Sequence, residues 1–149
     1  MLSCFSPDKK TLITLPGQEL LITDADVASI LGVNRGGMDA NSFLEYNYAS
    51  ARRNLAELLS SGFQKVSLSL TRAKSVLLSL HNADILTESE ERAFIAALLL
   101  YSASTFLVPM SNSDRNNMDY RLICAVSHTI NHQAVDWAAY TLRDFRISN

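Results

Sequence analysis

Three residue types that bind metals follow one another at intervals of four near the end of the chain. They are Cys124, His128 and His132, and Asp136 follows four residues later. Histidines four apart on a helix share one face and can bind zinc. Three ligands on successive turns of a straight helix, however, span about 12 Å, too far for metal bonds of about 2.1 Å to close on one ion. We therefore expect no metal site, a core Cys124, and both histidines near a solvated helix end.

The residue types of two further kinds of active site are also present. Ser127, His128 and Asp136 could form a catalytic triad, but adjacent helical residues point about 100° apart, and no Gly-x-Ser-x-Gly motif occurs. The glycine-containing loop 32–37 lacks the Gly-Lys-Ser/Thr ending of a phosphate loop. The sequence thus predicts no enzyme activity, no catalytic residue and no cofactor.

A DNA-binding function remains open as the alternative. Residues 26–33 resemble the first helix and turn of a helix-turn-helix protein. The second helix should begin directly after Val33, where Gly36-Gly37 and Asp39 oppose helix formation and phosphate contact. The cations that would contact nucleic acid are Arg35, Arg52, Arg53, Arg72 and Lys74. Solvated helix faces carry the same pattern.

The composition describes a folded chain without a global affinity for nucleic acid. Of 149 residues, 48% are hydrophobic and 19% charged, which excludes intrinsic disorder. The formal net charge is −2, so no overall basic field attracts phosphate. The two cysteines lie far apart and form no disulfide framework, which suits a reducing compartment. We expect one domain over residues 1–149, with residues 1–10 as a flexible segment.

Hydrophobic spacing and capping residues predict a mainly α fold, a single-domain bundle of about six helices with a small N-terminal β-hairpin. The hairpin would turn at Pro16-Gly17. A possible short strand covers 65–70, and a polar loop covers 111–117. Thr23 is the expected N-cap of the first helix, and Thr87 with Glu90 is the expected capping box of the central helix. The expected helices cover about 24–31, 42–60, 70–80, 88–108, 118–132 and 134–145.

The segment from Ala93 to Ser113 carries no charge and requires a test for a membrane span. A spanning helix needs about 20 mainly apolar residues, but several hydroxyl side chains interrupt this segment and Pro109 ends it. We expect no membrane contact. The pattern instead favours a central helix buried on all sides.

Three stretches, in order, resemble the plant mobile domain, also called the aminotransferase-like plant mobile domain. Residues 22–32, followed by Gly36-Gly37, are similar to the family's opening pattern of Thr, an acidic residue, Asp-Val, an aliphatic pair and Gly. Residues 91–109 resemble its helix with Arg-aromatic, aliphatic-Tyr and Phe-Leu-x-Pro motifs. Residues 136–142 resemble its final motif around a Trp. The resemblance covers residues 11–147.

The resemblance implies a nuclear protein linked to transposon silencing, genome integrity and meristem maintenance, without established catalysis. It also implies a protein partner, a serine/threonine phosphatase of the type-7-like class. From the residues themselves, the high apolarity predicts a non-enzymatic protein-interaction module, with Trp137 and Tyr140 as candidate partner anchors.

Overall fold

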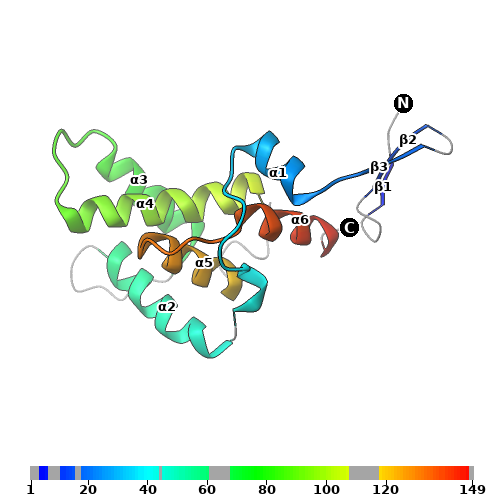
Figure 1. Cartoon of the computed structure of the whole chain (residues 1–149). Coiled ribbons are helices and arrows are strands. Elements are labelled where there is room, and N and C mark those ends of the chain that lie inside the picture. Colours follow the sequence, from blue (N-terminus) through cyan, green and yellow to red (C-terminus); the bar gives the residue numbers. More distant parts are fainter. Residues whose placement is uncertain are drawn as a thin grey trace. The chain divides into compact units, whose positions relative to one another are not determined.

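The structure is a computed structural model that describes residues 4–6, 11–15, 18–43, 45–60, 68–107 and 118–147. The chain divides into two compact units (Figure 1). The terminal unit comprises residues 1–39 and 135–149, and the central unit comprises residues 40–134. Each is described by itself, and the expectation of a single domain stays a prediction.

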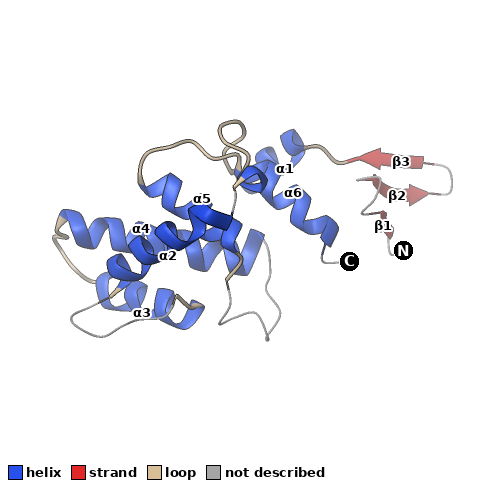
Figure 2. Cartoon of the chain, turned by 90° about the horizontal axis from the view of Figure 1, so that it is seen from below, coloured by secondary structure: helices blue, strands red, loops and turns tan. Residues whose placement is uncertain are grey.

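The terminal unit contains three short strands and two helices: β1 (Cys4–Ser6), β2 (Thr11–Leu15), β3 (Gln18–Leu21), α1 (Asp24–Leu31) and α6 (Trp137–Ile147). The strands pair antiparallel in the order β1-β2-β3 (Figure 2). β1 lies within the stretch expected to be flexible, and the predicted turn at Pro16-Gly17 lies outside the described residues.

Helix α1 begins and ends where the sequence predicts. The backbone N–H and hydroxyl of Thr23 donate to Asp26, and the Asp26 N–H donates back to the Thr23 hydroxyl, which completes a capping box. Gly32 ends the helix with a φ of 65°, a conformation that favours glycine. The inner face of α1 contacts α6, where Val27 is buried in a cluster with Ala138 and Leu142.

The central unit is helical in its described part: η1 (Ala40–Ser42), α2 (Glu45–Leu59), α3 (Leu70–Leu80), α4 (Glu88–Ser102), the π-helical η2 (Ala103–Leu107) and α5 (Tyr120–Ile130). Helix α4 contacts α2, α3 and α5 and is therefore the central helix of this unit. Together with α1 and α6 the described residues hold six α-helices, which confirms the mainly α prediction. The possible strand at 65–70 is wrong in its described part, because residues 68 and 69 lie in no strand and Leu70 begins α3. Residues 65–67 and the loop at 111–117 lie outside the described residues.

Local sequence explains where the central helices begin. The Ser69 hydroxyl accepts from the Arg72 N–H at the start of α3. The predicted box at α4 is confirmed, because Thr87 and Glu90 bond each other through backbone and side chain at 2.8–3.3 Å. Both caps supply hydrogen-bond acceptors to backbone amides that the first helical turn leaves without partners.

The prediction of a helix buried on all sides is wrong for α4. Its inner face is buried and consists mainly of alanines: Ala93, Ala96, Ala97 and Leu100. Ile95 and Leu98 are 40% and 45% exposed. Small side chains on the inner face allow close packing against neighbouring helices, and the larger Ile95 and Leu98 face outward. No helix in the described part of the chain has the length and apolarity to cross a membrane.

Candidate functional site

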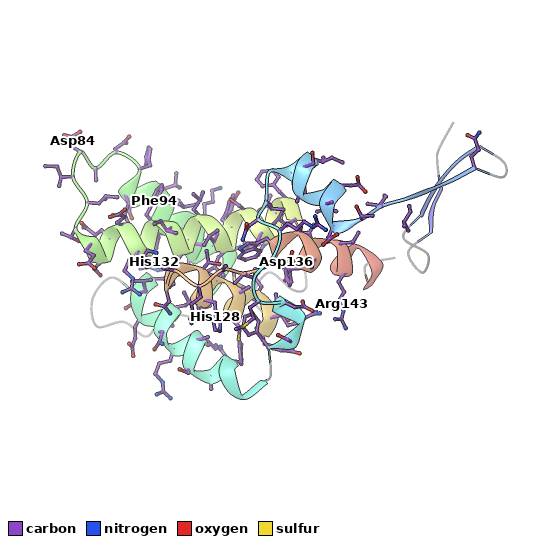
Figure 3. All side chains as sticks on the ribbon, viewed as in Figure 1. Asp84, Phe94, His128, His132, Asp136 and Arg143 are labelled. Carbon is purple, nitrogen blue, oxygen red and sulfur yellow. The ribbon has the colours of Figure 1, made fainter. Side chains whose placement is uncertain are left out.

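The residues whose types could bind a metal do not converge on one point. Cys124 is buried on α5. His128, labelled in Figure 3, stacks on Phe43 with ring centroids 4.6 Å apart, and its Nδ1 is hydrogen-bonded to Gln133. His132 lies beyond the end of α5, exposed, with a φ of 60°. Among the described residues, no three His, Cys, Asp or Glu side chains are placed to hold a metal ion.

Asp136 has a structural role in the terminal unit. Its Oδ2 accepts from the Gly36 N–H at 2.9 Å, and its Oδ1 accepts from the Ala139 N–H at 2.8 Å in the first turn of α6. The Asn34 carbonyl also accepts from the Ala138 N–H at 3.1 Å. The Asp136 carboxylate thus accepts the hydrogen bond of the Gly36 N–H, the kind of amide that a phosphate-binding loop would donate to its ligand. The same carboxylate joins the loop at 32–37 to α6.

Both predicted partner anchors are buried. Trp137 and Tyr140 are 7% and 1% exposed, and their rings meet edge to face with centroids 5.8 Å apart. A side chain inside the fold cannot reach a partner without local opening. The structure therefore argues against these two residues as anchors and assigns them to packing.

The helix-turn-helix geometry is absent from the described residues 32–43. After α1 the chain runs as a loop through Asp39, and only the three-residue η1 follows. Gly36 and Gly37 have φ values of 86° and 104°, which a helix cannot accommodate. Arg35, which would contact phosphate, pairs with Asp24 at 3.2 Å. Within residues 32–43, no recognition helix follows α1.

The other predicted nucleic-acid contacts lie on two separate helices. Arg52 and Arg53 are exposed on α2, where the Arg52 guanidinium lies 5.8 Å from the centre of the Tyr48 ring. Lys74 is exposed on α3. The Nε–H of Arg72 donates to the Leu59 carbonyl at 2.7 Å. Arg72 therefore caps the last turn of α2, and no contact described here joins these cations into one site.

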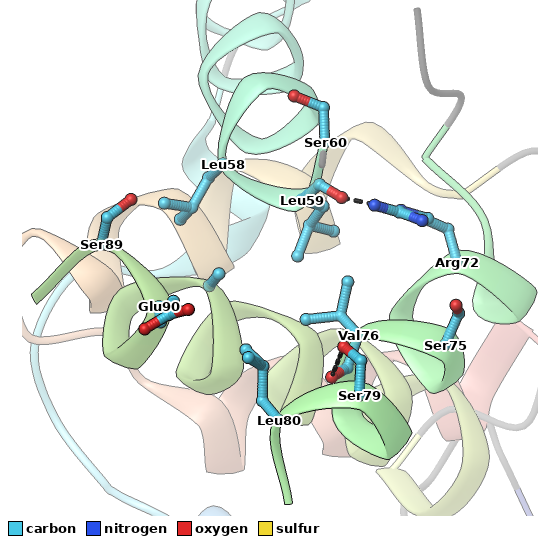
Figure 4. Close-up of a pocket in the computed structure, with 11 residues that line it drawn as sticks. Leu58, Leu59, Ser60, Arg72, Ser75, Val76, Ser79, Leu80, Ser89 and Glu90 are labelled. Atoms are coloured by element: carbon cyan, nitrogen blue, oxygen red, sulfur yellow. Dashed lines mark hydrogen bonds between the residues drawn. The ribbon is translucent and has the colours of Figure 1, made fainter. Parts of the chain in front are cut away.

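A pocket of about 340 Å³ lies between α2, α3 and α4 (Figure 4). It has an apolar floor and a rim of serines with one cation and one carboxylate, Arg72 and Glu90. Several rim groups are already engaged: Arg72 caps α2, Glu90 caps α4, and the Ser79 hydroxyl donates to the Val76 carbonyl. Its volume is at the lower limit for small-molecule sites. The lining residues are Leu58, Leu59, Ser60, Arg72, Ser75, Val76, Ser79, Leu80, Ser89, Glu90 and Ala93.

An exposed apolar stripe runs along the outer side of α4 and into η2. We call it the outer stripe: the exposed apolar Ile95, Leu98 and Phe106, with the half-buried Ser102 between them, three or four residues apart. Phe106 is 70% exposed, and no residue from 93 to 107 is charged. At 100° per residue, Leu98 points nearly opposite to the buried alanines of α4. The alanines spaced three and four apart were the sequence signal for a one-sided helix.

Comparison with known proteins adds a family. A family described as "Domain of unknown function (DUF8566)" matches residues 1–148. The chain belongs to this family. No curated protein and no solved structure matches it. The description of the DUF8566 family carries no activity, and the resemblance to the plant mobile domain stays a prediction.

Proposed function

We propose that this member of the DUF8566 family is a non-enzymatic protein-interaction module that docks a partner through the outer stripe. The observation that carries the proposal is the exposure of Ile95 and Leu98 on the outer side of α4 and of Phe106 on the η2 that follows it. A single exposed apolar side chain is normal on a protein surface, whereas a contiguous patch of them marks an interaction site. Aromatic residues such as Phe106 are also enriched at interfaces.

The roles of the reactive residue types support a non-enzymatic function. The Asp136 carboxylate binds two backbone amides and His128 stacks on Phe43. Burial raises the pKa of the Cys124 thiol, and the nearby charge of Asp119 adds to this effect. A thiol with a raised pKa forms less of the nucleophilic thiolate. These side chains stabilise local structure rather than face a common cavity.

The more specific form of the proposal comes from the resemblance to the plant mobile domain. It comprises a nuclear location, a role in transposon silencing and genome integrity, and a type-7-like phosphatase as partner. The N-terminal hairpin, which the β-prone runs around Pro16-Gly17 predict, is a separate part of the proposal. None of these is required for docking through the outer stripe, so each is tested separately, beginning with the location of the tagged full-length chain.

Site-directed photo-crosslinking tests the docking surface. A photoreactive amino acid replaces Leu98 on the stripe in one variant and Thr71, exposed on α3, in a matched control. In extract from the source cells, we expect a discrete crosslinked protein from position 98 and not from position 71. A second substitution, Phe106→Glu, should abolish that crosslink while the helical circular dichroism signal is retained. Equal crosslinking from both positions, or a crosslink that persists with Phe106→Glu, would contradict the proposal.

A further inference from the structure

Two acidic residues continue the line of the outer stripe toward the start of α4. Glu88, Glu91, Ile95, Leu98 and Ser102 follow one another at intervals of three, four, three and four. This is the spacing of the contact positions in a coiled coil. Both glutamates are exposed. A second helix laid along Ile95 and Leu98 would therefore also cover the two carboxylates.

These carboxylates have no described partner within the chain. Neither the Glu88 nor the Glu91 carboxylate makes a hydrogen bond or ion pair with the described residues, whereas the Glu90 carboxylate is engaged by Thr87. The helix dipole favours acidic residues in the first turn of α4. It does not compensate for the loss of water when another helix covers them, because a desolvated carboxylate requires a cation.

On the basis of the proposed function, we infer that the partner segment is an amphipathic helix of another protein. Its apolar face covers Ile95, Leu98 and Phe106, and Lys or Arg side chains at one end face Glu88 and Glu91. Complementary charge at the end of an apolar seam sets which helices pair and in which direction.

The same charges argue against a second copy of this chain as the occupant. In a parallel pair, Glu91 would face Glu91 of the other copy, and like charges repel. In an antiparallel pair centred on Leu98, residue 91 faces residue 105, so Glu91 would meet Thr105. The antiparallel pair supplies no cation, because residues 93–107 carry none. In the parallel pair the nearest cation is Arg92, which lies one position off the seam and donates to the Asn131 side chain at 3.0 Å.

Three designed helical peptides test the inference. They share one apolar seam and differ only at one end, which carries Lys, Gln or Glu at the seam positions. Binding to the full chain is measured by fluorescence anisotropy at low and high salt. We expect the Lys peptide to bind roughly tenfold or more tightly than the Glu peptide at low salt, with a smaller difference at high salt.

Variants of the chain assign the effect to residues. Glu91→Lys should reverse the order of the Lys and Glu peptides, whereas Glu57→Lys, the same change on the exposed surface of α2, should leave the order intact. Leu98→Glu should abolish binding of all three peptides while the circular dichroism spectrum is retained.

The outcomes separate this inference from the proposed function. Equal binding of the three peptides, or an unchanged order with Glu91→Lys, overturns the basic partner helix and leaves docking at the stripe intact. Absence of binding by every peptide also overturns it, and the crosslinking experiment then decides the proposed function by itself.

Discussion

The two hydrogen bonds of Asp136 predict a measurable loss of stability when the carboxylate is removed. Asp136→Ala deletes the acceptors for the Gly36 N–H at 2.9 Å and the Ala139 N–H at 2.8 Å. Loss of a helix N-cap costs about 1 kcal/mol, and a hydrogen bond to a charged group contributes about 1.5–3 kcal/mol. Gly36 is exposed, so water replaces part of the second bond. We expect the free energy of unfolding to fall by about 2 kcal/mol.

The assay is urea denaturation followed by circular dichroism at 222 nm. Asp136→Asn keeps one carboxamide oxygen as acceptor but presents an NH₂ donor at the other position, so it should fall between the wild type and Asp136→Ala. Asp84→Ala, at an exposed position in the loop before α4, removes the same group where no bond is described. That control should lie within about 0.5 kcal/mol of the wild type.

The reasoning would be refuted by an Asp136→Ala variant as stable as the Asp84→Ala control. A local readout strengthens the test, because Asp136→Ala should also increase hydrogen exchange at the Gly36 amide. If stability falls while that amide stays protected, the loss arises at the start of α6 and the link to the loop is wrong.

Three further predictions follow from local geometry. Gly36→Ala should destabilise the chain by about 1 kcal/mol in the same urea assay, because the Gly36 φ is 86° although no atom would clash with the added Cβ. Bonds from the backbone and hydroxyl of Thr87 hold the pKa of Glu90 below its ordinary value of 4.5. The stability that the ionised Glu90 gives the fold is therefore present above pH 4.5 and is lost as pH falls through the lowered pKa. An acid titration of the stability of Glu90→Gln should lack this loss, and a titration like that of the wild type would refute the capping role. In a Cys4→Ser background, the buried Cys124 should react with a thiol reagent at least roughly tenfold more slowly than in the urea-unfolded chain.

The sequence alone predicts the parts of this fold that depend on neighbouring residues. Thr87 forms the expected capping box with Glu90, and Thr23 is the expected N-cap and also forms a box with Asp26. Gly32, directly after α1, takes the left-handed conformation that glycine adopts most readily at a helix end. These features are decided within one helical turn, where side chain and backbone meet regardless of the rest of the chain.

Long-range partners were not predictable from the same patterns. Asp136 lies 100 positions from Gly36, and nothing in the local sequence pairs an acidic residue with that amide. Trp137 and Tyr140 have the composition of partner anchors, yet both are buried. Burial depends on which elements cover a side chain, and residue type alone does not specify that.

The uncharged segment shows why hydropathy could not locate the candidate site. An apolar run fits a helix buried on all sides and equally fits a helix buried on one side, and the position of the small residues decides between them. The buried face of α4 consists mainly of alanines, whereas Ile95 and Leu98 keep over a third of their surface exposed. Full burial of such a side chain stabilises a protein by about 1.5–3 kcal/mol, so the exposed part gives up a fraction of that. The arrangement lowers the stability of the isolated chain and leaves apolar area whose burial can stabilise a complex, as the proposed docking at the outer stripe requires.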